Sequence, residues 1–199
     1  MTQRLLLGTR NAGKVAELRA LLAGLDLDAL SVTDLADPPP DPPEDAATYA
    51  ENAISKAQAY ARATGLPTIA DDSGLEVDAL GGAPGVRSRR YFGEDVVPAD
   101  RNRMLLALLD GVAERTARFV AVIAYAQPDG RVETFDGEVR GEIGAAPRGA
   151  AGFGYDPLFV VAGDGRTMAE LPQREKNAIS HRGLAAAKLR AALASPSLG

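Results

Sequence analysis

The chain of 199 residues contains no cysteine. Disulfides, zinc–thiolate sites, iron–sulfur clusters and cysteine nucleophiles are therefore excluded, and nothing indicates an oxidising compartment. Long apolar runs are also missing. The opening MTQRLLLGTR has too short an apolar run for a signal peptide, and no stretch approaches the roughly 20 apolar residues of a membrane span. We therefore expect a cytoplasmic protein with no membrane partner.

An excess of basic charge is lacking too. The chain has 22 Lys and Arg against 27 Asp and Glu, which gives a net charge of −5, and no long basic run offsets it. The resulting field repels nucleic acid, so we expect no nucleic-acid partner. A ligand that carries phosphates would need locally concentrated positive charge or a metal ion.

Histidine occurs only once, at His181. A serine–histidine–aspartate mechanism would have to use this residue, and no G-x-S-x-G motif supports such a mechanism. A lone histidine is most often structural. A hydrolase of this type is therefore not favoured.

The sequence does contain alternating apolar strands and amphipathic helices, in an ordinary globular composition with 46% hydrophobic residues. The expected strands cover residues 4–8, 67–71, 118–126, 131–136 and 159–162. Strands 118–126 and 131–136 should form a hairpin, because Pro128-Asp129-Gly130 stands between them. The expected helices cover residues 12–25, 45–64 and 98–110, and a last one begins after Ser180 and ends near residue 194, before Pro196. Residues 80–93 should form a long ordered loop. Because no repeat or linker interrupts the pattern, we expect one α/β domain over residues 1–199 with a mixed sheet.

A proline-rich acidic segment precedes the second expected helix. Between Arg19 and Lys56 there are eight acidic residues and no basic one, and five prolines stand within residues 38–43. The prolines require an extended loop. A charge run is usually a solvated face, but Glu44 stands where the stiffened loop meets the helix.

Residues 8–14 read GTRNAGK between the first strand and the first helix. Backbone N–H groups at a helix N-terminus and a nearby Lys14 make a site suited to phosphates. The spacing matches G-x-x-x-x-G-K of the Walker A loop, but Val15 stands where that loop has a hydroxyl for magnesium. The segment is therefore a true P-loop, an ordinary turn with Lys14 on the surface, or a phosphate site of another geometry that uses Thr9, Asn11 and Lys14. The last interpretation is favoured.

Residues 70–74, ADDSG, come at the end of the expected strand 67–71. Ligands of open α/β sheets gather beyond the carboxyl ends of strands. Adjacent carboxylates in an extended segment point to opposite sides, so only one of Asp71 and Asp72 should face a site. That carboxylate could bind magnesium together with substrate phosphates, or deprotonate an attacking water. The alternative is a turn in which Asp and Ser bond the local backbone.

Two further motifs, FGYDP at residues 153–157 and KNAISHR at residues 176–182, are suited to a flat ligand. Glycine on both sides of Phe153 lets an aromatic ring and the backbone approach such a ligand closely. Lys176, His181 and Arg182 would present several hydrogen-bond donors at the start of the last helix.

Five motifs thus stand in order: T-x-N-x-x-K at 9–14, ADDSGL at 70–75, LGGAPG at 80–85, FGYDP at 153–157 and EKNAISHR at 175–182. Together they closely resemble the inosine triphosphate pyrophosphatase family, over residues 5 to about 189. The resemblance implies an α/β fold of two lobes around a long mixed β-sheet with flanking helices, and a nucleotide cleft between the lobes. It also implies a homodimer that uses Mg²⁺ to hydrolyse the purine nucleoside triphosphates ITP, dITP and XTP to the monophosphate and pyrophosphate.

The resemblance assigns roles to the matching positions. Asp72 would be the catalytic residue and a metal ligand, Glu44 the second metal-linked carboxylate, and Ser73 a substrate contact. The triphosphate would be held by Thr9, Arg10, Asn11, Ala12, Gly13 and Lys14, and the nucleoside end by Phe153, Gly154, Tyr155, Asp156, Lys176, His181 and Arg182.

Two positions depart from the family pattern. Family members often have glycine where Arg10 stands, so this extra cation either helps to bind phosphate or points away from it. The prolines within residues 37–43 are the second departure, and they directly precede Glu44.

Base choice has a physical basis as well. Hypoxanthine and xanthine carry an acceptor oxygen at position 6, where adenine carries a donor amino group. Donors such as His181 and Arg182 would therefore favour ITP and XTP over ATP, because buried groups left unpaired can discriminate by about 10⁴ or more. Two rival functions are a P-loop-like NTPase or nucleotide kinase, which would release orthophosphate or ADP, and a non-catalytic nucleotide-sensing module, which would leave ITP intact.

Overall fold

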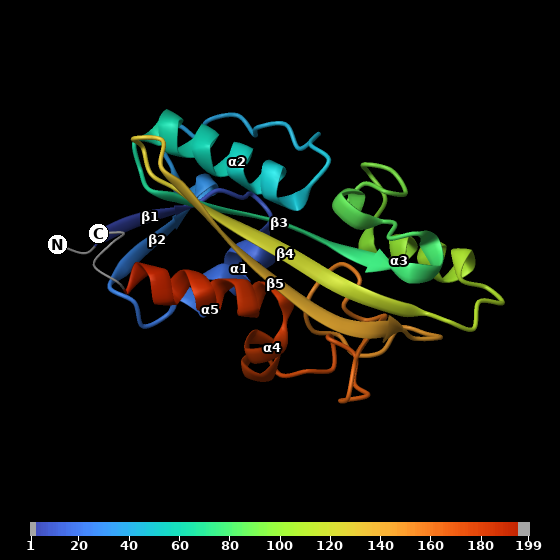
Figure 1. The fold of residues 1–199 in the computed structure, drawn as a ribbon. Helices are drawn as coiled ribbons and strands as arrows, with labels where there is room; N and C mark the ends of the chain where they lie inside the picture. Colours follow the sequence, from blue (N-terminus) through green and yellow to red (C-terminus); the bar gives the residue numbers. More distant parts are fainter. Residues whose placement is uncertain (1–2, 195–199) are drawn as a thin grey trace. The chain divides into compact units, whose positions relative to one another are not determined.

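The computed structural model describes residues 3–194, which form six strands and five α-helices (Figure 1). The strands are β1 (Gln3–Leu7), β2 (Leu27–Ser31), β3 (Thr68–Val77), β4 (Thr116–Ala126), β5 (Val132–Ile143) and β6 (Phe159–Val161). The helices are α1 (Ala12–Leu22), α2 (Tyr49–Thr64), α3 (Pro98–Leu108), α4 (Gln173–Ile179) and α5 (His181–Leu193). The strands hydrogen-bond in the order β2-β1-β3-β4-β5-β6. β1 pairs in parallel with β2 and β3, whereas β5 and β6 are antiparallel, which confirms the expected α/β class with a mixed sheet.

The chain divides into two compact units. Within the described residues, unit 1 holds residues 3–72, 121–137 and 182–194, and unit 2 holds residues 73–120 and 138–181. Each unit has a core of its own. In unit 2 the core includes Leu75 of β3, Leu105 of α3, Phe119 of β4 and Phe159 of β6.

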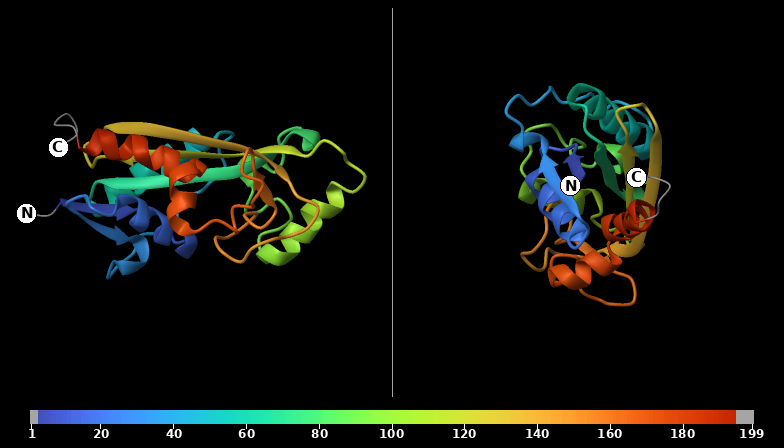
Figure 2. Two further views of the ribbon diagram at one scale, coloured as in Figure 1. Left: turned by 90° about the horizontal axis from the view of Figure 1, so that it is seen from below. Right: turned by 90° about the vertical axis from the view of Figure 1, so that its left-hand side faces the viewer.

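In unit 1 the strands carry different side chains on their two faces. Leu7, Ile69 and Ile123 pack with residues of α1 and α5. Ala70 and Ala124 pack with small side chains of α2 instead. In the right-hand view of Figure 2, α2 lies above these strands and α1 and α5 lie below them. Because successive side chains of a strand alternate between faces, odd-numbered positions face α1 and α5, and even-numbered positions face α2.

The chain begins with a β–α–β unit. Helix α1 ends at Leu22, before the expected residue 25, because Ala23 leaves the helical conformation with ψ of 139° and Gly24, with φ of +85°, completes a turn. The chain then forms β2, which was not predicted. A strand signal exists there, because apolar Leu27 and Ala29 alternate with acidic Asp28. Residues of β2 pair in register with β1 from Gln3 to Leu7.

Helix α2 begins at Tyr49, four residues later than expected, because its cap lies at Thr48. Thr48 Oγ1 accepts from the Glu51 backbone N–H, and Glu51 Oε2 accepts from the Thr48 N–H, each at 3.2 Å. This reciprocal capping box is a strong start signal. Gly65, with φ of +67°, ends the helix, as expected.

Strand β3 corrects the prediction that the strand ends at residue 71. It continues through Asp72, Ser73 and Gly74 to Val77. These three residue types favour turns, but Leu75 and Val77 are fully buried in unit 2 and extend the strand. Asp72 is therefore an interior strand residue, not the residue at the strand's end.

The later elements agree in kind with expectation. Strands β4 and β5 flank the predicted hairpin turn, where the Gly130 N–H donates to Gln127 O at 3.0 Å. Helix α4 was not predicted, and Ser180 stands directly before α5. The predicted stop at Pro196 lies outside the described residues. None of the helices within residues 3–194 is both long and apolar enough to cross a membrane.

Candidate active site

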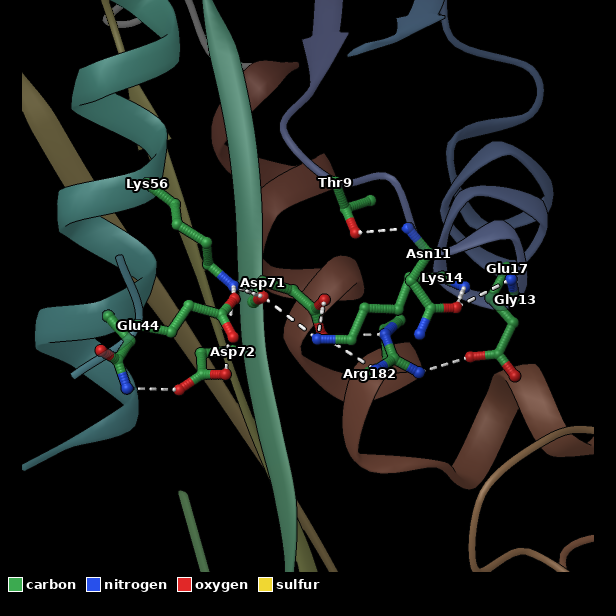
Figure 3. Close-up of polar contacts among 11 residues, drawn as sticks. Thr9, Asn11, Gly13, Lys14, Glu17, Glu44, Lys56, Asp71, Asp72 and Arg182 are labelled. Carbon is green, nitrogen blue, oxygen red and sulfur yellow. Dashed lines mark hydrogen bonds and ion pairs between the residues drawn. The ribbon is translucent and has the colours of Figure 1, made fainter. Parts of the chain in front are cut away.

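Two adjacent aspartates of β3 point to opposite faces of the sheet (Figure 3). Leu7, the last residue of β1, is paired with Ile69, so Asp71 and Asp72 lie just beyond the carboxyl end of β1. By the alternation of the strand, Asp71 shares the face of Ile69, and Asp72 shares the face of Ala70 toward α2. Both are buried, with exposed fractions of 0% and 5%. The prediction that the two carboxylates diverge is confirmed.

The segment between β1 and α1 is held by its own polar side chains. Asn11 Oδ1 accepts from the backbone N–H groups of Gly13 at 2.9 Å and of Lys14 at 3.2 Å. Thr9 Oγ1 accepts from the Asn11 N–H at 3.2 Å. Asn11 is thus the N-cap of α1, and Thr9 fixes the cap in turn. The loop presents the start of a helix, which favours anions.

Lys14 belongs to a buried ion-pair network around Asp71. Lys14 Nζ lies 2.9 Å from Asp71 Oδ1, and Arg182 Nε and Nη2 donate to Asp71 Oδ2 at 3.0 and 2.9 Å. Arg182 Nη1 also donates to Glu17 Oε2 at 2.5 Å. The network joins β3 to α1 and α5 within unit 1.

The network shifts the pKa of its members. Burial would raise the pKa of Asp71, but the neighbouring cations, Arg182 first and then Lys14, hold it well below the usual range. Burial lowers the pKa of Lys14, although Asp71 opposes that effect. Asp71 is therefore a permanent carboxylate that compensates buried cations, rather than a group that exchanges protons.

Asp72 has a different environment, on the α2 side. Asn52 Nδ2 donates to Asp72 Oδ2 at 3.0 Å, and Lys56 Nζ lies 4.0 Å from Asp72 Oδ1. Lys56 also donates to Asp71 O at 2.8 Å and to Glu44. Burial raises the pKa of Asp72, and Lys56 and Lys14 offset part of this rise. A carboxylate with one fixed oxygen and a raised pKa can accept a proton from water.

Glu44 and Asp72 both approach the Lys56 ammonium, and Figure 3 shows the three side chains together. Among residues 3–194, no group of three or more His, Cys, Asp or Glu could hold a metal ion. Magnesium often takes one or two carboxylates and completes its shell with water and substrate phosphates. The two carboxylates therefore fit a divalent ion that arrives with a phosphate ligand.

In the structure, Arg10 contacts the proline-rich loop that precedes Glu44. Its Nε donates to Asp41 Oδ1 at 2.7 Å, and its Nη2 donates to Pro39 O at 2.7 Å. Both acceptors belong to the proline-rich loop. A contact of Arg10 with phosphate stays a prediction.

In unit 2, the FGYDP motif and α4 meet at a buried ion pair. Lys176 Nζ lies 2.6 Å from Asp156 Oδ2, which also accepts from the Phe153 N–H at 2.8 Å. Lys176 Nζ lies 5.5 Å from the centroid of the Phe153 ring. A Cβ at Gly152 would lie 2.1 Å from Asp156 Oδ2, so only glycine leaves room for this pair. The glycine before Phe153 thus serves the ion pair.

The other expected contacts of unit 2 have structural partners. Tyr155 is buried in the core, and its hydroxyl donates to Ser88 O at 3.0 Å. The His181 ring stacks on Phe119, with centroids 4.8 Å apart and planes at 16°. Gly154 O accepts from an amide of α3, and Ser73 is a half-buried residue of β3. Contact of these residues with a substrate stays a prediction.

Sequence reasoning missed Asn52 and Lys56, which hold Asp72 and Glu44. A signal for them exists: the two residues are four apart on α2, on a buried face whose other residues are alanines and tyrosines. Polar residues on a buried face require partners. The pairing of Arg182 with Asp71 and Glu17 had no such local signal.

These features define an α/β protein with a helix N-terminus, a buried and a half-buried lysine, and a pair of acidic side chains beside parallel strands. The model of the Ham1 family matches residues 5–192, and the chain belongs to this family. It is 52% identical over 189 residues to a dITP/XTP pyrophosphatase of Geobacter sulfurreducens, which covers 94% of each chain. It is 51% identical over 192 residues to a dITP/XTP pyrophosphatase of Deinococcus deserti, which covers 96% of this chain and 89% of the relative.

Solved structures agree with this result. A HAM1 protein from Coxiella burnetii superposes with a TM-score of 0.86 at 42% identity, over 96% of this chain and 98% of the other. A nucleoside-triphosphatase, or dITP/XTP pyrophosphatase, from Mycobacterium abscessus superposes with a TM-score of 0.72 at 40% identity, over 97% and 100% of the two chains. The expected family resemblance is confirmed.

Proposed function

We propose that this chain hydrolyses the non-canonical purine nucleotides dITP, XTP and ITP between the α- and β-phosphates, and so removes them from the nucleotide pool. The observation that carries the proposal is the environment of Asp72, a buried carboxylate fixed by Asn52 and close to Lys56. Membership of the Ham1 family and the names of the relatives, dITP/XTP pyrophosphatases, support the substrate class.

In the proposed reaction, Asp72 accepts a proton from the attacking water. The water oxygen bonds to the α-phosphorus, the bond from that atom to the α–β bridging oxygen breaks, and pyrophosphate leaves with the electron pair. Asn52 holds one carboxylate oxygen of Asp72 and so fixes the orientation in which the carboxylate can accept the proton. Lys14, Lys56 and the positive end of the α1 dipole stabilise the phosphate charge.

Asp72 and Glu44 would hold a divalent cation, which we propose to be Mg²⁺. When bound, the ion neutralises phosphate charge and polarises the phosphorus that is attacked. Glu44 would then exchange its contact with Lys56 for one with the ion, and the Lys56 ammonium would become available to a phosphate oxygen. Asp41 is the less suitable carboxylate, because Arg10 and Tyr60 both donate to it.

The nucleoside end would be bound by Phe153, Asp156, Lys176 and His181. The Asp156–Lys176 pair and the stacked His181 ring support this role, because both are buried and carry polar atoms. Arg182 donates to Asp71 and Glu17, which supports a role next to Lys14, and its expected contact with the base stays a prediction. Preference for ITP and XTP over ATP stays a prediction.

We further propose that the enzyme is a homodimer and acts in the cytoplasm. The family resemblance supports the dimer, and the absence of cysteine is compatible with a reducing compartment. Light scattering should give twice the mass of the 20.7 kDa chain. The mass of a single chain at micromolar concentration would contradict the dimer.

Product analysis tests the function. The purified protein is incubated with dITP, XTP, ITP or ATP and Mg²⁺, and the phosphates are identified by ³¹P NMR. We expect the monophosphate and pyrophosphate from dITP, XTP and ITP, and little turnover of ATP. Orthophosphate or a nucleoside diphosphate would indicate a P-loop-like NTPase or kinase, and binding without turnover would indicate a sensing module.

A further inference from the structure

Arg10 and the proline-rich loop contact each other within unit 1. Arg10 Nε donates to Asp41 Oδ1 and Nη2 to Pro39 O, both at 2.7 Å. Asp41 Oδ1 also accepts from the hydroxyl of Tyr60. The loop is therefore held by an arginine of the expected triphosphate loop and by a tyrosine of α2.

Tyr60 is a rigid partner, because its side chain is only 2% exposed. A Cβ at Gly8 would lie 3.0 Å from Tyr60 Cδ2, so the ring packs directly against the first residue of the expected triphosphate loop. One turn earlier on α2, Lys56 binds Glu44. Because residues four apart lie on the same helix face, α2 holds the loop at two neighbouring points, Asp41 and Glu44.

Only Pro42 and Pro43 stand between these two points. Proline fixes φ near −65°, and each proline also restricts the residue before it. The segment is therefore a stiff spacer, and a displacement of Asp41 is transmitted to Glu44. A flexible spacer would absorb such a displacement.

We propose that Arg10 and Tyr60 are positioning residues that, through Asp41 and the two-proline spacer, fix Glu44 beside Asp72. The segment at the start of α1 and the segment that carries Glu44 are thereby coupled, so that a displacement of one displaces the other. The consequence for metal binding rests on the proposed function, whereas the coupling of the two segments does not.

The competing role for Arg10 is a direct contact with the triphosphate. The two roles differ in what they require of Asp41. A positioning role needs the Arg10–Asp41 contact, so removal of either partner should have the same effect and removal of both should add little. A direct phosphate contact needs only Arg10.

The first experiment uses the protein without metal or nucleotide. Hydrogen–deuterium exchange of the amides in residues 41–48 is compared for wild type, Arg10→Ala, Asp41→Asn and Tyr60→Phe. We expect roughly three- to tenfold faster exchange in each variant, since a partly exposed ion pair and one hydroxyl contribute modestly. Arg19→Ala is the matched control, because Arg19 of α1 forms an exposed pair with Asp34, outside the proline-rich loop. Unchanged exchange in Arg10→Ala and Asp41→Asn would overturn the proposal.

The second experiment measures Mn²⁺ binding by electron paramagnetic resonance, with α,β-methylene dITP as an unreactive nucleotide. We expect the Mn²⁺ dissociation constant to rise about three- to tenfold in Arg10→Ala, in Asp41→Asn and in the double variant alike. Affinity for the nucleotide without metal should change no more in Arg10→Ala than in Asp41→Asn. Weaker metal-free nucleotide binding in Arg10→Ala alone, with Asp41→Asn unaffected, would assign Arg10 to phosphate and refute the positioning role.

The two experiments separate failure of the inference from failure of the function. A chain that binds no purine nucleotide would contradict the proposed pyrophosphatase, yet the exchange rates would still decide whether the two segments are coupled. Normal nucleotide and metal binding with unchanged exchange would leave the proposed function intact and refute the coupling.

Discussion

Asp71 and Asp72 are neighbours in the chain, but their carboxylates have opposite properties. The strand turns Asp71 toward Arg182 and Lys14, which lower its pKa, and turns Asp72 toward α2, where burial raises its pKa. Two titratable groups whose environments separate their pKa values mark a division of tasks. At the residue scale, Asp71 organises cations, and the proposed function assigns proton transfer to Asp72.

Replacing Asp72 should therefore remove turnover without unfolding the protein. Asp72→Asn keeps the size of the side chain but cannot accept a proton from water, and we expect dITP hydrolysis to fall by roughly 10²- to 10⁴-fold. Steady-state pyrophosphate release measures the rate, and circular dichroism checks the fold. Asp110→Asn, an exposed change, is the control. A rate near that of wild type would end the assignment.

Replacing Asp71 should affect stability instead. Asp71→Asn leaves Arg182 and Lys14 buried with less compensation, and breaking such a network costs about 3–5 kcal/mol of unfolding free energy. Because the pKa of Asp71 is lowered in the folded state, its contribution is present above the unfolded pKa, near 4, and is lost as the pH falls below it. Urea unfolding at several pH values should show that the unfolding free energy of the wild type falls at acid pH, and that the part due to Asp71 is missing in the variant. Equal stability of both proteins at pH 7 would contradict the role.

At the scale of elements, α2 is the platform for the acidic side of the site. Asn52, Lys56 and Tyr60 are spaced by four residues, and each contacts a carboxylate outside the helix. The register of the helix thus sets three contacts at once. A helix that carries such a row depends on a defined start, which Thr48 supplies.

The cap gives a prediction for this element. Thr48→Ala removes the acceptor for the Glu51 N–H and should lower the unfolding free energy by about 1 kcal/mol. Thr48→Ser keeps a hydroxyl in the same place and should retain most of it. Urea unfolding compares the two variants. A loss of similar size in both would indicate that packing of the Thr48 methyl group, and not the cap, stabilises the start of α2.

Elements with local signals were predictable from the sequence, and elements set by distant contacts were not. The residues of the GTRNAGK segment themselves indicate the start of α1, and the predicted start at residue 12 was confirmed. The extension of β3 past Asp72 was missed, because Ser73 and Gly74 favour turns and only burial in unit 2 overrides them. The pair of Glu17 and Arg182 joins positions 165 residues apart, and no local pattern reveals it.

At the scale of the whole molecule, the chain passes back and forth between the two units. The chain crosses from one unit to the other within β3, β4 and β5 and at the start of α5. Three of these crossings lie inside strands and not in linkers. Neither unit is a continuous segment of the chain.

The units should therefore unfold together. If residues 73–120 lost their packing, β3 and β4 would lose pairing in unit 1 as well, so we expect one cooperative transition. Pulsed hydrogen–deuterium exchange along a urea gradient follows both units in one experiment, with peptides from α2 and α5 for unit 1 and from α3 and α4 for unit 2. All four should become exchangeable at the same urea concentration. An earlier midpoint for α3 and α4 would show that unit 2 opens separately, and that the chain is two domains instead of the expected one.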